Sequence, residues 1–101
     1  MKNQEVILGI IINGGNARSN SMRAIKLAKN GQIEEAKLAL LNAIECLGEA
    51  HKIQTSLIED EANGDEIELS LLMIHAQDHL MNAMTIKDLA AEIVDIYVKL
   101  S

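Results

Sequence analysis

The segment from Leu69 to Met84 reads LSLLMIHAQDHLMNAM and is one of the most apolar stretches of the chain. It contains no Gly, Pro, Lys or Arg, and its Leu, Met and Ala content favours a helix. Two imidazoles, a carboxylate and two amides interrupt it: His75, Gln77, Asp78, His79 and Asn82. Polar groups in such a helix need a partner or a function, because burying them unsatisfied is costly.

The helical period places most of these polar side chains on one face. At about 100° per residue, four of them share an arc of roughly 100°: His75, Asp78, His79 and Asn82. We call these four residues the polar cluster. The apolar residues that precede and follow them on that face are Leu71, Leu72, Ile86, Leu89 and Ile93. We therefore expect the polar cluster to lie on the face that the rest of the helix turns toward the core.

Two Asn-Gly pairs divide the chain into three long helices. Gly is the usual residue just past a helix end, so Asn30-Gly31 and Asn63-Gly64 are helix stops. The predicted helices end near Lys29, run from about 32 to 62, and run from about 67 to 100. Short connections between long helices predict an all-α fold, an antiparallel three-helix bundle with up-down-up topology, in a single domain over residues 1–101.

The first predicted helix contains a weak segment, Asn13-Gly14-Gly15-Asn16. Each Gly costs about 1 kcal/mol relative to Ala in a helix. The segment is interpreted as a kink, a π-bulge, a point where another backbone approaches closely, or a tolerated weak spot.

Composition excludes several classes of function. The net charge of -6 argues against nucleic-acid binding, which needs a basic face. The single cysteine, Cys46, cannot form an internal disulfide, as is usual in a reducing cytosol. No apolar run approaches the ~20 residues of a membrane span, and the N-terminus has no signal-peptide pattern. We expect a soluble, cytoplasmic protein without direct membrane insertion.

The third predicted helix is apolar nearly all round. Opposite the polar cluster it carries Met73, Ile74, Leu80, Met81 and Met84. A helix that is hydrophobic on every side is buried on every side, and a three-helix bundle leaves one face of each helix in water. Self-association through this helix is the simplest expectation. The alternative is a monomer with an apolar groove for a partner.

The spacing of the polar cluster leaves three kinds of chemistry open. A neutral imidazole such as His75 is a good nucleophile near pH 7 and can carry a phosphoryl group, with an N–H donor from His79 one turn away. Asp78 would repel a phosphate and is better placed at a seam between helices or subunits. In the second interpretation, His75, His79 and Asp78 ligate zinc. The third is a satisfied structural network.

The second predicted helix adds weaker candidates. His51 and Gln54 lie on or near its apolar stripe, where a lone histidine is more often a satisfied core residue than a ligand. The acidic run Glu59-Asp60-Glu61 is interpreted as a wet helix end, because three consecutive helical acids point in different directions and make a poor metal site.

The heptapeptide His75–Met81, HAQDHLM, resembles the signature of the enzyme IIA components of the bacterial phosphotransferase system for lactose, cellobiose and chitobiose. Asn13–Ser19, NGGNARS, is similar to that family's glycine-containing stretch in helix one. Glu49–Ile58 resembles its helix-two segment, and Asn63-Gly64 its second turn. The resemblance covers essentially the whole chain, as one enzyme IIA domain.

The resemblance implies a cytoplasmic homotrimer of three-helix subunits that acts as a phosphotransferase component. His75 would accept a phosphoryl group from the phosphocarrier HPr and give it to a cysteine of the cognate enzyme IIB during uptake of a β-linked disaccharide. His79 and Gln77 would line the site, with His51 and Gln54 as candidate neighbours across the cleft. Asp78 would meet its symmetry mates at the trimer axis and bind a metal ion, often assigned as Mg²⁺.

Two features depart from lactose-type relatives. Asn16 stands where many of them carry Asp, and Tyr97 is the only aromatic residue besides the histidines. Both lean toward the cellobiose and chitobiose side. The alternative function is a non-catalytic helical interaction module, or a metal-binding bundle, whose His/Asp cluster is structural.

Overall fold

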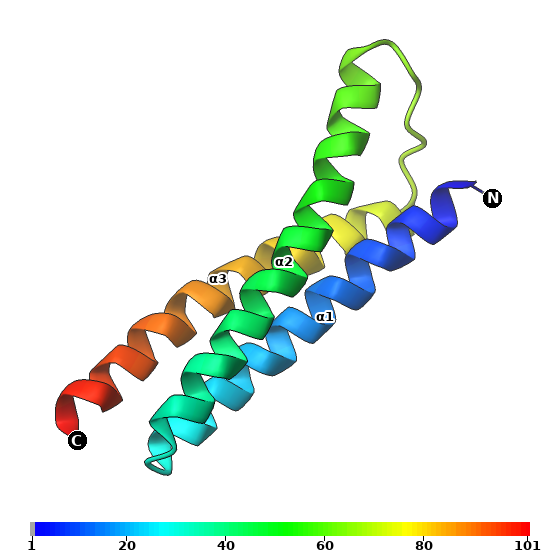
Figure 1. Ribbon diagram of the computed structural model, residues 1–101. Coiled ribbons are helices and arrows are strands. Elements are labelled where there is room, and N and C mark those ends of the chain that lie inside the picture. Colours follow the sequence, from blue (N-terminus) through cyan, green and yellow to red (C-terminus); the bar gives the residue numbers. More distant parts are fainter. Residues whose placement is uncertain (1) are drawn as a thin grey trace.

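The structure, a computed structural model, describes residues 2–101, with side chains from Gln4 onward. It contains three helices: α1 Lys2–Lys29, α2 Ile33–Ala62 and α3 Leu71–Leu100. They run up, down and up in a rod of 53 × 20 × 17 Å (Figure 1). The all-α, three-helix prediction is confirmed. None of these helices has an apolar stretch that would suffice to cross a membrane.

Both predicted helix stops are confirmed, and they have the same geometry. After α1, the Gly31 N–H donates to the Ala28 carbonyl at 3.0 Å and the Gln32 N–H to the Leu27 carbonyl at 2.9 Å. Gly31 has φ +83° and Gly64, after α2, has φ +95°. This is the Schellman arrangement, in which a left-handed residue lets the chain turn back and satisfy the last carbonyls of the helix.

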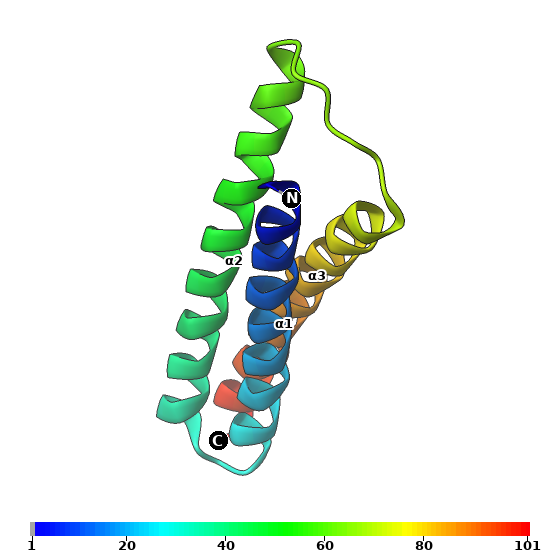
Figure 2. The same ribbon diagram turned by 90° about the vertical axis from the view of Figure 1, so that its right-hand side faces the viewer.

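The third helix begins later than the sequence indicated. It starts at Leu71 instead of near residue 67, and residues 65–70 are not helical. The cause is Ser70, whose side chain accepts a hydrogen bond from the Met73 N–H at 3.0 Å and caps the helix. Figure 2 shows that the end of α2 extends beyond α1, so the chain needs an extended connection to return to α3.

The core is built mainly from small side chains. Helix α1 packs against both of the other helices, which touch each other less. Between α1 and α3 lie fully buried alanines such as Ala17, Ala76 and Ala83, with Ile10 and Leu80 as the largest apolar side chains that are fully buried. Because alanine side chains take up little space between helices, the three backbones can lie close together.

The expectation that the polar cluster shares the core face of α3 is wrong. The buried face of α3 consists of other residues: Met73, Ala76, Leu80, Ala83, Ala90 and Val94. Leu71 and Leu89, predicted to flank the cluster in the core, are 84% and 58% exposed. The helix has two apolar faces, and α1 packs against the one with alanines because they allow the closer approach.

We predict opposite effects for the same substitution at two exposed glycines. An added Cβ meets nothing within 4 Å at Gly31 or at Gly48, but only Gly31 has positive φ. Gly31→Ala should lower the free energy of unfolding by about 1 kcal/mol. Gly48→Ala, inside α2, should raise it by about 0.5–1 kcal/mol. Denaturant unfolding at one protein concentration measures both; changes of equal sign would contradict this reading of the turn.

Candidate functional site

The two histidines of α3 form the centre of the candidate site. His75 and His79 lie one turn apart, and their rings are stacked with centroids 5.9 Å apart and an interplanar angle of 18°. His75 is exposed, whereas His79 is half-buried. The His75 ring is therefore open to solvent, and the His79 ring is less exposed.

A pair of glycines in α1 makes room for the His79 ring. A Cβ on Gly14 would lie 3.3 Å from His79 Cδ2 and 3.7 Å from the Leu80 Cα, and one on Gly15 would lie 3.4 Å from His79 Nε2. Helix α1 passes through this segment as regular α-helix. Of the interpretations offered for Asn13–Asn16, the close approach of another helix agrees with the structure, and the side chain approached is His79.

Gln77 belongs to a different side of α3. Its Oε1 accepts a hydrogen bond from Gln54 Nε2 of α2 at 2.5 Å. Its Nε2 donates to Met73 Sδ at 3.8 Å. His75 and Gln77 are two residues apart, about 200° around the helix. The structure therefore brings Gln77 and Gln54 together, as one pair, but turns them away from the two histidines.

His51 lies on the same side as Gln77. It is exposed and lines a groove of about 270 Å³ between α2 and α3, whose other walls include Ile44, Leu47 and Met84. The expectation that it is a satisfied core histidine is wrong, because α2 turns it outward. Within one chain, the predicted site residues thus form two groups on opposite sides of α3.

Asp78 lies on an exposed face of α3 that is otherwise apolar. Ile74 and Met81, its neighbours on that face, are 56% and 57% exposed. The expectation that these two residues lie opposite the polar cluster is therefore wrong. Exposed residues recur at intervals of three and four: Leu71, Ile74, Asp78, Met81 and Thr85. This is the spacing of a coiled-coil seam. The spacing is present in the sequence, but the positions of the polar cluster alone did not reveal it.

The structure gives no metal site within one chain. No three His, Cys, Asp or Glu side chains among the described residues are grouped so that they could hold a metal ion. The zinc interpretation of His75, Asp78 and His79 is therefore not supported by the geometry of the single chain. A site that uses Asp78 would need ligands from other copies.

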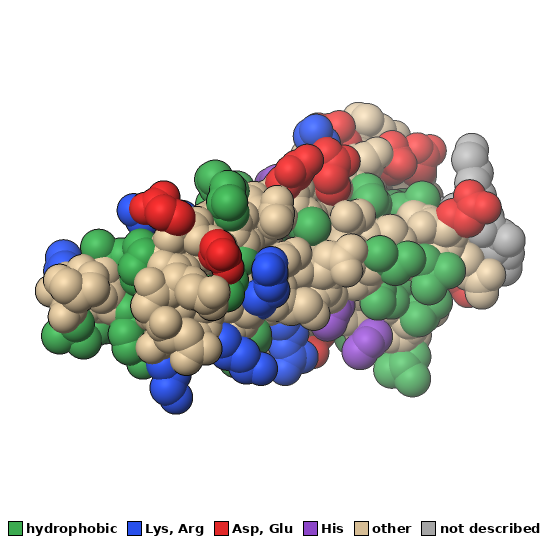
Figure 3. Space-filling view, turned by 60° about the horizontal axis from the view of Figure 1, so that its bottom comes forward, with side chains coloured by type: hydrophobic (Ala, Val, Ile, Leu, Met, Phe, Trp, Pro, Cys, Tyr) green, Lys and Arg blue, Asp and Glu red, His purple; other side chains and the backbone are tan. Residues whose placement is uncertain are grey.

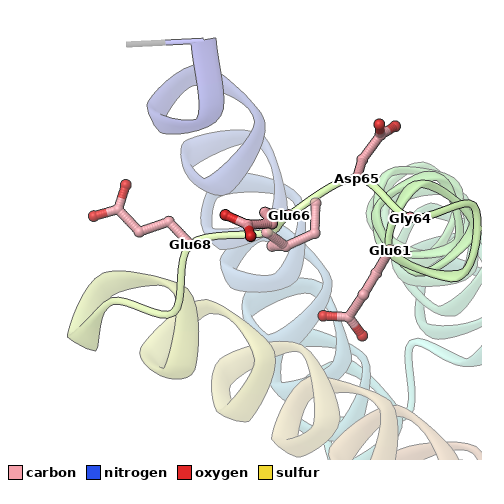
Figure 4. A pocket seen from close by; sticks show the side chains of 6 residues that line it. Glu61, Gly64, Asp65, Glu66 and Glu68 are labelled. Carbon is pink, nitrogen blue, oxygen red and sulfur yellow. The ribbon is translucent and has the colours of Figure 1, made fainter.

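The acidic end of the bundle fits the expectation of a wet helix end. The α2–α3 connection surrounds a hollow of about 680 Å³ lined by Glu61, Asp65, Glu66 and Glu68. Their carboxylates point in different directions (Figure 4). All four residues are exposed, so water solvates these charges and no ligand is needed to balance them.

Sequence reasoning missed a set of basic residues beside His79. Arg18, Arg23 and Lys26 of α1 line a groove of about 580 Å³ together with Gly15 and His79. The sequence contains the signal for this set, because no Asp or Glu occurs between Glu5 and Glu34. Every charged residue in the later part of α1 is therefore basic.

The chain matches the family described as the lactose/cellobiose-specific IIA subunit of the phosphotransferase system over residues 5–98. It is 54% identical over 98 residues to the lichenan-specific phosphotransferase enzyme IIA component of Bacillus subtilis (strain 168), covering 97% of this chain and 89% of that protein. It is 42% identical over 97 residues to the N,N'-diacetylchitobiose-specific EIIA component of Escherichia coli (strain K12), covering 96% and 84%.

Solved structures agree with this match. The crystal structure of the cellobiose-specific enzyme IIA of Bacillus anthracis superposes with a TM-score of 0.96 at 50% identity, covering 99% of this chain and 92% of that one. The IIA(Chitobiose) component in the solution structures of its complex with HPr, from Escherichia coli, gives a TM-score of 0.81 at 40% identity, covering 96% and 94%.

We predict that a larger residue at Gly14 disturbs both packing and the His79 ring. Gly14→Val should lower the free energy of unfolding by about 1–3 kcal/mol, because its methyl groups meet His79 and the α3 backbone. It should also shift the His79 ring resonances in NMR spectra. The matched variant Gly48→Val, with open space around it, should change stability by less than about 0.5 kcal/mol. An unmoved His79 signal in Gly14→Val would refute the contact.

Proposed function

The chain belongs to the lactose/cellobiose-specific IIA family of the phosphotransferase system, and from this membership and the geometry above we propose that it carries a phosphoryl group on His75. It would take the group from phospho-HPr and pass it to a cysteine of the cognate enzyme IIB, as a cytoplasmic carrier in the uptake of a β-linked disaccharide. Two relatives are named for cellobiose and N,N'-diacetylchitobiose, which are β-linked disaccharides, and these names support this class of sugar.

The exposed His75 ring, stacked on a ring that is seated in the protein, carries the proposal. In the first transfer a ring nitrogen of His75 attacks the phosphorus of phospho-HPr, and the new N–P bond forms as the bond to the donor breaks. In the second transfer the cysteine thiolate of enzyme IIB attacks that phosphorus, forms an S–P bond and releases the His75 nitrogen. Both partners need access, which favours His75 over the half-buried His79.

His79 has the supporting role in this scheme. Backbone N–H groups in the middle of a helix are already bonded to carbonyls, so α3 offers no amide cradle for a phosphate. The ring of His79 lies within stacking distance of His75 and presents an N–H that would donate to a phosphoryl oxygen. Gly14 and Gly15 leave room for that ring beside α1, since a Cβ added at either would lie 3.3–3.4 Å from it.

A homotrimer through α3 completes the site in our proposal. Measured from Asp78, His75 lies about 60° to one side of the exposed apolar face and Gln77 about 100° to the other. In a closed ring of parallel copies, each side of one α3 faces the opposite side of its neighbour. The His75 and His79 of one copy would then lie beside the Gln77 and Gln54 of the next, with His51 at the edge of the same cleft.

Asp78 would lie on the axis of that trimer. Three carboxylates brought together in an apolar seam repel one another, and burial without compensation is costly. A divalent cation relieves both effects, and Mg²⁺ prefers oxygen ligands of this kind. The three Asp78 side chains would hold the ion, whose role is structural because His75 points to the side of the seam.

We predict that His75 is the only residue labelled by the phosphotransferase chain. Incubation with phosphoenolpyruvate, enzyme I and HPr should add one acid-labile phosphoryl group per chain. His75→Ala should abolish the label, and His79→Ala should slow its appearance about 10²-fold, through loss of a donor. His51→Ala, which removes an exposed histidine on the other side of the chain, should still be labelled. Label that persists in His75→Ala would exclude this assignment, and no label at all would favour a non-catalytic interaction module.

We predict that the charge at position 78 controls assembly. Sedimentation velocity at micromolar concentration should show a trimer for the wild type and a monomer for Asp78→Lys, because three ammonium groups cannot share the axis. Asp78→Leu should keep the trimer, since an apolar axis removes the burial cost. Asp60→Lys makes the same change of charge at the exposed end of α2 and should leave assembly intact. A monomeric wild type would remove the argument for a shared axis.

A further inference from the structure

The charges of this protein are unevenly distributed. The chain has a net charge of -6, yet no acid lies between Glu5 and Glu34. The cations of that interval are Arg18, Arg23, Lys26 and Lys29. An acidic protein therefore has one basic strip, along the second half of α1.

The cations of this strip form no ion pair with an acid of their own chain among the described residues. The ion pairs in residues 4–101 all involve lysines of α2 and α3: Lys37–Glu34, Lys52–Glu49, Lys87–Asp88 and Lys99–Asp95. Lys26 and Lys29 lie in the last turn of α1, where the helix C-terminus favours cations, whereas Arg18 and Arg23 are farther from it and are available to an anion from outside the chain.

The basic strip borders His79, whose ring is stacked on that of His75. Arg18, Arg23 and Lys26 line the groove of about 580 Å³ that ends at His79. Lys and Arg side chains gather beside two His side chains on the face drawn in Figure 3. A Cβ added to Gly15 would lie 3.4 Å from His79 Nε2, and Arg18 follows Gly15 by three residues on α1. Among the cations that line the groove, Arg18 is thus the one nearest in the chain to the point where α1 touches the His79 ring.

A phosphoryl group on His75 needs such charge. Phosphoryl groups on proteins carry about -1.5 to -2 charges at pH 7. The neighbouring side chain Asp78 is negative, and a neutral His79 contributes one N–H donor and no net charge. A guanidinium offers several donors in a planar fork that matches phosphoryl oxygens and stays charged at any physiological pH.

We propose that the α1 groove is the anion-binding part of the phosphoryl site, and that Arg18 binds oxygens of the phosphoryl group while it is carried on His75. This inference rests on the proposed function and adds to it the source of positive charge. Arg23 and Lys26, farther along the groove, raise the local potential without contact. Arg18 forms no covalent bond, and the N–P and S–P steps stay balanced as written above.

The test compares Arg18→Gln with Lys29→Gln, which removes the same charge from the same helix outside the groove. In phosphorus NMR titrations of the phosphorylated protein, Arg18→Gln should raise the pKa of the phosphoryl group by roughly half a unit or more, because the nearby cation favours the dianion. Lys29→Gln should leave that pKa unchanged, and Arg18→Lys should restore most of it. A pKa in Arg18→Gln equal to that of the wild type would overturn the proposal.

A second measurement separates this inference from the proposed function. Titration of the unphosphorylated protein with inorganic phosphate should shift the His79 ring resonances in the wild type and in Lys29→Gln, and this response should be lost in Arg18→Gln. If His75 never accepts label but this response depends on Arg18, the groove is an anion site and the carrier function is wrong. If His75 accepts label and neither measurement depends on Arg18, the carrier function stands and the groove has no part in it.

Discussion

The close contact between α1 and α3 is the constraint on which the rest of this structure depends. Gly14 and Gly15 let α1 approach until the space of a single Cβ separates it from the His79 ring. Buried alanines along both helices extend the approach toward the ends of the bundle. With mainly small residues in this contact, other apolar residues of α3 such as Leu71, Ile74 and Leu89 are left exposed. The choice of small residues for the inner contact therefore determines which apolar surface remains exposed.

The sequence predicted the number, order and ends of the helices well, because those depend on local chemistry. Asn-Gly pairs turn the chain by a mechanism that needs only a left-handed glycine and its own helix carbonyls. The start of α3 was missed although Ser70 is a standard capping residue. The apolar residues Ile67 and Leu69, which both precede Ser70, favoured the prediction of a helix in this segment. The length of the return from α2 is a property of the whole fold.

The sequence predicted the residues of the candidate site but not that they form two groups on opposite sides of α3. Spacing alone placed His75 and His79 together, and the structure confirms that contact. Spacing placed Asp78 in the same arc, and only its charge, which would repel a phosphate, suggested a separate place at a seam. It could not show that Gln77 pairs with Gln54, since this depends on which side of α3 faces α2. The orientation of α3 was in turn undetermined, because a helix with two apolar faces has two equally good ways to pack by hydrophobic pattern alone. Only the fit of small residues between helices, a property of two segments distant in sequence, distinguishes them.

Helix α3 carries a core face, an outer apolar face and a histidine between them, and this explains its composition. Its alanine-rich side forms the core with α1 and α2. Its outer side, with Ile74, Asp78 and Met81, presents a seam that water does not favour. His75 lies between the two faces and is exposed in the single chain. A reactive ring in the core would be inaccessible, and one in the middle of the seam would be closed by association. A side chain on the border between the two faces can be held by neighbours on both sides and still be reached by another protein.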